Sequence, residues 1–153
     1  MPDLAEFLVR AKRATYASQG EGGERVRTED AGRQLTFHEA SWSYDDLYYG
    51  TNPFVGRELV HHDGELVWAM TYYGRVVDET LRPGDVYAFL KAAMVRVSRT
   101  RPFRGPASYT DGVWAYTDVG IGGLDMFSGT ESIVLAGREV YRLHYSGGRM
   151  RGV

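Results

Sequence analysis

A stretch of 21 residues occurs twice in this chain of 153 residues, and this repeat constrains the fold more than any other feature. Residues 54–74 read FVGRELVHHDGELVWAMTYYG, and at a constant offset of 73 residues 127–147 read FSGTESIVLAGREVYRLHYSG. Seven positions are identical, whereas average composition gives about one identity by chance. Because a repeat of this length is one supersecondary unit, we expect a tandem duplication.

Each copy of the repeat predicts a β-hairpin. The first copy has strands at 54–62 and 66–73 around an Asp63-Gly64 turn, and the second copy turns at Ala136-Gly137. A further strand precedes each hairpin, at 35–44 and 109–117. Trp42, Tyr44 and Asp46 match Trp114, Tyr116 and Asp118 at an offset of 72, which extends the repeat backwards.

Two helices complete the predicted units. The first helix, at 3–16, and the second, at 84–98, each carry an apolar stripe with a period of 3.6 residues. The fold class that follows is α+β: an αβββ unit used twice in a single domain 1–153, with halves at about 1–76 and 77–153. We expect antiparallel sheet with both helices packed on it, and a pseudo-twofold axis with a central cleft. Residues 18–33 lack any period and predict a mobile loop.

Composition excludes several classes of function. A net charge of −2 argues against a general binder of nucleic acid or anionic membranes. The absence of cysteine removes disulfides and thiolate chemistry, and is consistent with a cytoplasmic location. We expect no signal peptide and no transmembrane segment. The sequence contains no phosphate-binding glycine motif and no nucleophile elbow, and no histidine pattern predicts a metal site, so we expect no cofactor.

Two glutamates are the main candidates for function. Alternation along the strands places Glu58 and Glu131 in rows that are otherwise apolar. A buried carboxylate needs a partner, a raised pKa or contact with solvent in a cleft. One interpretation is structural, with each glutamate bound to backbone N–H groups, to Arg104 or Arg33, or to a tyrosine hydroxyl. Another is a ligand site, and a third is acid/base catalysis, which requires that the two pKa values differ.

The chain also resembles an uncharacterised bacterial domain family that occurs alone or behind XRE-type helix-turn-helix regulators. The resemblance covers nearly the whole chain and rests on FLxxAKxATYA from Phe7, FxGxE from Phe54 and from Phe127, WAMxYxGR from Trp68, PFRGP from Pro102, and Val140-Tyr141. It implies a sensor or effector-binding role. The duplicated layout is also similar, at the level of the fold, to gyrase-inhibitor-like effector-binding domains, whose cleft holds aromatics and a glutamate for cationic ligands.

The leading hypothesis is therefore a small-molecule binding module that acts without catalysis. Its site would contain Glu58 and Glu131 within aromatic walls, and the aromatic pairing suggests a cationic aromatic ligand. The remaining predicted site residues are Trp68, Tyr72, Tyr141, Tyr145 and Arg104. The alternatives are an enzyme that uses Glu58 or Glu131 as acid or base with Arg104 as an anion clamp, and a domain that forms a homodimer through exposed aromatics.

Overall fold

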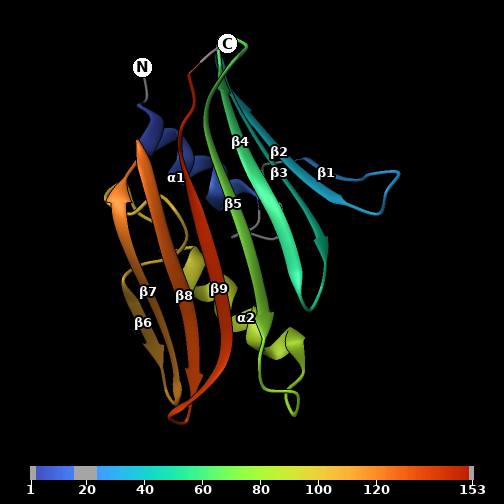
Figure 1. Ribbon diagram of the computed structural model, residues 1–153, viewed down its shortest axis with the longest axis vertical. Coiled ribbons are helices and arrows are strands. Elements are labelled where there is room, and N and C mark those ends of the chain that lie inside the picture. Colours follow the sequence, from blue (N-terminus) through green and yellow to red (C-terminus); the bar gives the residue numbers. More distant parts are fainter. Residues whose placement is uncertain (1–2, 16–23, 152–153) are drawn as a thin grey trace.

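The computed structural model describes residues 3–15 and 24–151, which form one antiparallel sheet of nine strands and two short helices (Figure 1). In chain order the elements are α1 (Leu4–Ala14), β1 (Glu24–Arg27), β2 (Arg33–Glu39), β3 (Trp42–Gly50), β4 (Phe54–His62), β5 (Glu65–Val76), α2 (Pro83–Met94), β6 (Ser108–Asp111), β7 (Trp114–Gly123), β8 (Met126–Leu135) and β9 (Arg138–Arg149). The order across the sheet is β1-β2-β3-β4-β5-β9-β8-β7-β6. The connections within β1–β5 and within β6–β9 are antiparallel hairpins, and strands β5 and β9 join the two groups.

The predicted α+β class is wrong, because strand dominates the described residues and the helices are short. The αβββ unit is also wrong, since within these residues five strands follow α1 and four follow α2. Segment 35–44 is two strands, because Ala40 adopts a positive φ of 53° and reverses the chain. Segment 109–117 likewise contains a turn at Gly112, where φ is 60°. The two halves join edge to edge, because β5 pairs directly with β9 in one continuous sheet.

The predicted loop at 18–33 is only partly a loop. Its first residues, 18–23, lie outside the described part of the chain. Residues Glu24–Arg27 form the edge strand β1, which pairs with β2. The turn that follows is closed by Thr28, whose backbone N–H donates to the carbonyl of Gly32.

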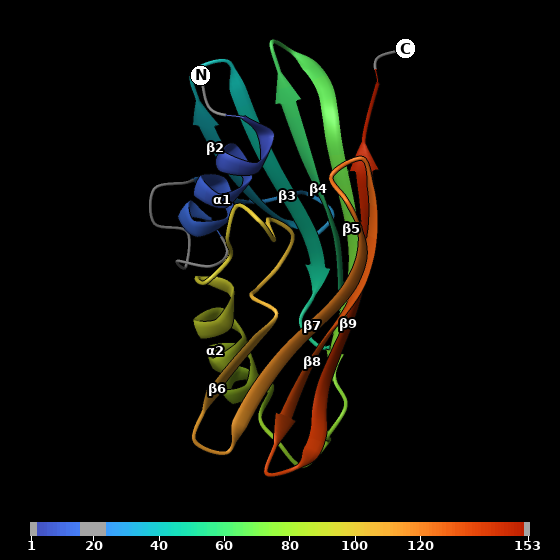
Figure 2. The same cartoon turned by 90° about the vertical axis from the view of Figure 1, so that its left-hand side faces the viewer.

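Both helices pack on the same face of the sheet, which we call the inner face (Figure 2). Helix α1 begins at the N-cap Asp3, whose carboxylate accepts a hydrogen bond from the backbone N–H of Glu6. Its Phe7 ring stacks on Trp42 of β3 at a centroid distance of 5.3 Å. Helix α2 begins at Pro83, and its Phe89 ring stacks on Trp114 of β7 at 5.3 Å. Each helix thus covers a different half of the sheet, and the core lies between.

The segment between α2 and β6 enters the space between the helices and the sheet. Helix α2 ends at Met94, and Pro102 and Pro106 in the following segment keep the chain from resuming a helix. Phe103 then packs on Phe127 of β8 at a centroid distance of 4.4 Å. The backbone N–H of Gly105 donates to the hydroxyl of Tyr116. These two anchors fix Arg104 in the interior, where its side chain is buried.

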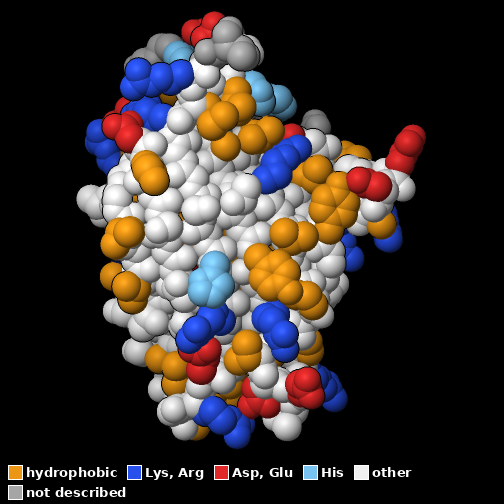
Figure 3. Space-filling model, in the orientation of Figure 1, with side chains coloured by type: hydrophobic (Ala, Val, Ile, Leu, Met, Phe, Trp, Pro, Cys, Tyr) orange, Lys and Arg blue, Asp and Glu red, His pale blue; other side chains and the backbone are white. Residues whose placement is uncertain are grey.

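The outer face of the sheet carries no helix from the described part of the chain (Figure 3). Small polar side chains and backbone cover most of it, and hydrophobic side chains are scattered in separate groups. A shallow depression of about 610 Å³ lies here over strands β4, β5, β7, β8 and β9, with Tyr73 and Ile121 among its exposed lining residues. No helix among the described residues has the length and apolar character needed to cross a lipid bilayer.

Candidate functional site

Strand β3 places a carboxyl group in an aromatic row. Its inner-face residues are Trp42, Tyr44, Asp46 and Tyr48, which follow from strict alternation along the strand. Asp46 has only 3% of its surface exposed, and its Oδ1 accepts a hydrogen bond of 2.5 Å from the hydroxyl of Tyr72 on β5. In the β3–β4 ladder Asp46 pairs directly with Glu58. Two carboxyl groups are therefore adjacent in the interior.

Helix α1 supplies the cation that pairs with Glu58. The Lys12 Nζ lies 2.7 Å from Glu58 Oε1 and also donates to the carbonyl of Phe103, and both side chains are fully buried. Lys12 reaches this position because it follows Leu8 by four residues on the face of α1 that packs on the sheet. The buried charge of Glu58 is thus compensated by an equally buried ammonium group.

The segment between α2 and β6 supplies the cation that pairs with Glu131. The Arg104 guanidinium makes a two-pronged contact, with Nη2 2.9 Å from Oε1 and Nε 3.2 Å from Oε2. The hydroxyls of Tyr116 and Tyr141 donate to the same carboxylate, at 2.5 and 2.8 Å. Glu131 therefore accepts four hydrogen bonds, and these offset the desolvation cost of burying its carboxylate.

Asp118 on β7 has a contact that Asp46 lacks. It pairs with Glu131 in the β7–β8 ladder, as Asp46 pairs with Glu58, and it accepts a hydrogen bond from Tyr145 at 2.8 Å. The Arg101 guanidinium approaches its Oδ2 at 3.5 Å. No described residue forms an ion pair of this kind with Asp46. The two aspartates therefore have similar hydrogen bonds but different charge environments.

This difference appears in the pKa values. Burial, with the neighbouring Glu58 carboxylate adding to it, raises the pKa of Asp46 to about 8. Burial also raises the pKa of Asp118, but only to about 6, with the hydrogen bond from Tyr145 and the charge of Arg101 opposing the shift. Burial lowers the pKa of Lys12, and the Glu58 carboxylate opposes that shift. Near neutral pH, Asp46 therefore holds a proton more readily than Asp118 does.

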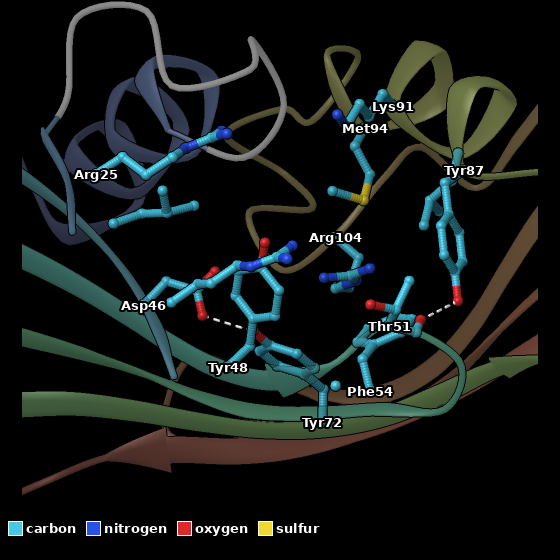
Figure 4. A pocket seen from close by; sticks show the side chains of 14 residues that line it. Arg25, Asp46, Tyr48, Thr51, Phe54, Tyr72, Tyr87, Lys91, Met94 and Arg104 are labelled. Atoms are coloured by element: carbon cyan, nitrogen blue, oxygen red, sulfur yellow. Dashed lines mark hydrogen bonds between the residues drawn. The ribbon is translucent and has the colours of Figure 1, made fainter. Parts of the chain in front are cut away.

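A cavity of about 270 Å³ opens beside Asp46, between the β1–β5 half of the sheet and helix α2 (Figure 4). Its buried floor contains Asp46, Tyr72 and Arg104, and the Asp46–Tyr72 hydrogen bond lies along it. The walls and rim are formed by Leu35, Tyr48, Gly50, Thr51, Phe54, Tyr87, Leu90 and Met94 together with Arg25, Arg33 and Lys91. Tyr87 donates its hydroxyl to the carbonyl of Thr51, which ties α2 to the β3–β4 connection.

Four of its lining side chains are cationic and one is acidic. Arg104 lies on the floor, while Arg25, Arg33 and Lys91 lie nearer the solvent, with the two arginines exposed. Figure 4 shows Arg25 extended across the cavity from β1, and Lys91 on the opposite side from α2. Among described residues, none of these three outer cations forms an ion pair. The cavity therefore presents uncompensated positive charge.

The predicted site residues divide into two groups. Tyr72 and Arg104 line the cavity. The others do not line it and are buried within the core: Glu58, Glu131, Trp68, Tyr141 and Tyr145. Glu131 contacts Arg104, as one interpretation of the sequence proposed, while Trp68 stacks on Phe127 at 5.6 Å.

Sequence reasoning missed Asp46, Lys12 and the outer cations as parts of the site. Asp46 carries the same signal as Glu58, a carboxylate in an alternating aromatic row, and the row Trp42, Tyr44, Asp46 was available to the same test. Lys12 directly follows Ala11 and lies four residues after Leu8, among the buried residues of α1. Arg25 and Arg33 have no local signal, because the pairing of β1 with β2 brings them to the cavity. Among described residues, no group of three or more histidine or acidic side chains is arranged to hold a metal ion.

The domain is built on a single sheet, and its interior holds buried charged side chains beside a cavity. The chain belongs to an uncharacterised family, the domain of unknown function DUF5680, whose model matches residues 46–150. The matched region includes Asp46, Glu58, Tyr72 and Arg104. No curated protein and no solved structure gives a match to the chain.

Proposed function

We propose that this domain binds a small organic anion with an aromatic or apolar body in the cavity between the sheet and α2. The observation that carries the proposal is the lining itself, with four cationic side chains and one carboxyl group, that of Asp46, whose pKa is raised by burial to about 8. Ligand sites are concave and mostly apolar, with a few polar groups that fix orientation. This cavity combines apolar walls with a few polar groups, and its volume of about 270 Å³ lies just below the usual range of about 300–1,000 Å³.

The aromatic walls favour a flat or bulky body for the ligand. Phe54 and Tyr87 meet edge to face at a centroid distance of 5.8 Å, so their ring orientations are fixed before a ligand arrives. Leu90 and Met94 close the side formed by α2. Ordered walls reduce the entropy lost on binding, because few side chains remain to be immobilised.

The charge of the lining favours an anion over the cation that the sequence suggests. Glu58 and Glu131 are fully buried and already paired with Lys12 and Arg104, so neither offers its charge to a ligand. A cation would instead lie near Arg25, Arg33 and Lys91, where like charges repel it. Binding of a cationic ligand remains a prediction, and the experiment below tests it against binding of an anionic ligand.

Catalysis and self-association remain predictions with less support. Acid/base chemistry on a bound substrate would need Glu58 or Glu131 to reach the cavity, which their pairing opposes. The outer face carries apolar side chains in separate groups, which favours a homodimer less than one continuous patch would. The sensor role behind an XRE-type regulator and the similarity to gyrase-inhibitor-like domains fit a ligand-binding module, and our proposal does not depend on them.

Isothermal titration calorimetry with three matched probes tests the proposal. The probes are 2-naphthoate, 2-naphthylmethanol and 2-naphthylmethylammonium, which share one ring system and differ in charge. We expect 2-naphthoate to bind at least about tenfold more tightly than the neutral probe, since one unscreened charge contact is worth about 1.4 kcal/mol or more. The cationic probe should bind most weakly.

Two variants locate the binding. Replacing two of the three outer cations in Arg33→Gln/Lys91→Gln should reduce the affinity for 2-naphthoate about tenfold and leave that for 2-naphthylmethanol unchanged. Arg142→Gln is the matched control, because Arg142 lies on β9 away from the cavity and pairs with Glu139. Tightest binding of the cation, no binding of any probe, or an equal loss in the control would overturn the proposal.

A further inference from the structure

The buried carboxyl groups outnumber the buried cations beside the cavity. Four acids are buried, Asp46, Glu58, Asp118 and Glu131, with two buried cations, Lys12 and Arg104, and the partly exposed Arg101 beside Asp118. Lys12 pairs with Glu58 and Arg104 pairs with Glu131. Among the described residues, Asp46 is the remaining acid of this group, and its hydrogen bond comes from the neutral hydroxyl of Tyr72.

We propose that Asp46 determines the specificity of the cavity by donating a hydrogen bond from its carboxyl group to the carboxylate of a bound organic acid. This inference rests on the proposed function, because it assigns the acidic group of that ligand. Because Tyr72 donates to Oδ1, we assign the proton of the acid to Oδ2 of Asp46, a residue that lines the cavity. The proposed ligand is therefore an organic acid whose carboxylate accepts a hydrogen bond from the neutral carboxyl group of Asp46.

The surroundings of Asp46 support a neutral carboxyl group at that place. The groups that face it are Glu58 from β4, Tyr72 from β5, Lys12 from α1 and Arg104 from the segment after α2, and burial together with Glu58 outweighs the rest, which raises the pKa of Asp46 to about 8. The outer cations Arg25, Arg33 and Lys91 line the same cavity from β1, β2 and α2. A carboxylic acid kept neutral in this way can donate to a ligand at neutral pH.

The consequence is that the complex retains a proton that the free protein loses as the pH rises. Above the pKa of Asp46 in the free protein, binding must either take up one proton from the buffer or bring two carboxylates together. The affinity for a carboxylate should then fall about tenfold for each pH unit above that point. Below it, the affinity should be constant, because Asp46 already holds its proton in the free protein and 2-naphthoate stays ionised.

Titration of 2-naphthoate from about pH 6 to about pH 9.5, in paired buffers of different ionisation enthalpy, tests this inference. We expect constant affinity to about pH 7.5, then a fall of about tenfold per unit, with uptake of close to one proton at the upper end. Asp46→Asn keeps a donor and an acceptor at the position, so it should bind at neutral pH with a flat profile and no proton uptake. Asp118→Asn is the matched control and should follow the wild type, because Asp118 does not line the cavity.

The Tyr72→Phe variant adds a readout that does not depend on Asp46→Asn folding. The hydrogen bond from Tyr72 opposes the rise in the pKa of Asp46, so its removal should move the fall in affinity to higher pH. A flat profile in the wild-type protein would overturn the role of Asp46 while leaving anion binding intact. A profile in Asp46→Asn that falls as in the wild type would overturn it as well. Failure of 2-naphthoate to bind at any pH would instead overturn the proposed function.

Discussion

Asp46 and Glu58 face each other across the β3–β4 ladder, and both carboxyl groups are buried. One of them has a cation at 2.7 Å and the other has a tyrosine hydroxyl. Like charges in such a position cannot both ionise without a large cost, so the pair divides into a carboxylate and a carboxylic acid. The predictions below concern this division and the packing that maintains it.

The stability of the protein should fall as the pH rises from about 4 to about 8. The pKa of Asp46 is about 8 in the folded state and about 3.9 in an unfolded chain. Between these values the folded protein holds a proton that the unfolded protein has released, so each pH unit lowers the free energy of unfolding by up to about 1.4 kcal/mol. Asp46→Asn should remove the contribution of Asp46 to this slope, so its stability relative to the wild type should increase up to about pH 8 and then level off.

Urea denaturation of the wild type and Asp46→Asn at several pH values measures this difference. Asp118→Asn is the matched control. Its stability relative to the wild type should also increase with pH, but should level off near the lower pKa of Asp118, about 6. Equal slopes for the wild type and Asp46→Asn would show that Asp46 ionises normally in the folded protein.

Removing Lys12 should be far more damaging than removing an exposed arginine of the same helix. Lys12→Met leaves the Glu58 carboxylate buried without its cation, which typically costs about 3–5 kcal/mol of the free energy of unfolding. Arg10→Met also breaks an ion pair, with Glu39, but both partners are partly exposed and the cost should be about 1 kcal/mol or less.

A double-mutant cycle with Glu58→Gln completes this test, with unfolding followed by circular dichroism. The double variant Lys12→Met/Glu58→Gln should lose less stability than the two single variants added together. Additive losses would mean that Lys12 and Glu58 act independently, in spite of the distance of 2.7 Å between their charged atoms.

A methyl group at Gly129 should disrupt the second half of the sheet. An added Cβ would lie 2.3 Å from the Cζ of Tyr145, which cannot retreat because Asp118 accepts its hydroxyl hydrogen bond and Phe127 packs beside its ring. Gly129→Ala should therefore lower the free energy of unfolding by about 3 kcal/mol. Gly84→Ala in the first turn of α2 is the control, because an added Cβ there meets no atom within 4 Å, and it should leave the melting temperature unchanged or slightly raised.

Local signals in the sequence were sufficient for the hairpins and the buried rows. Asp63-Gly64 and Ala136-Gly137 form the turns that join β4 to β5 and β8 to β9. Glu58 and Glu131 lie on the buried face that alternation predicts, each at 0% exposure. The period of two residues fixes these features, because a slip by one residue would turn the whole row to solvent.

The remaining features depend on distant parts of the chain. The β5–β9 pairing joins strands from the two halves, and no pattern within either strand indicates which edge it will meet. Short strands such as β1 and β6 have too few residues to show a period. The cavity combines Arg25, Asp46, Tyr72, Lys91 and Arg104, which come from different elements, so its charge could be judged only after those elements were placed.

The place of β9 in the middle of the sheet has a consequence for how the chain assembles during synthesis. Strand β5 can pair with β4 as soon as both have been synthesised. Its other edge stays unpaired until strand β9, Arg138–Arg149, leaves the ribosome. An open edge of twelve residues is a template for pairing with another nascent chain. Closing it last makes completion of the sheet a late, long-range event, and a chain that stalls before β9 would be exposed to aggregation at this edge.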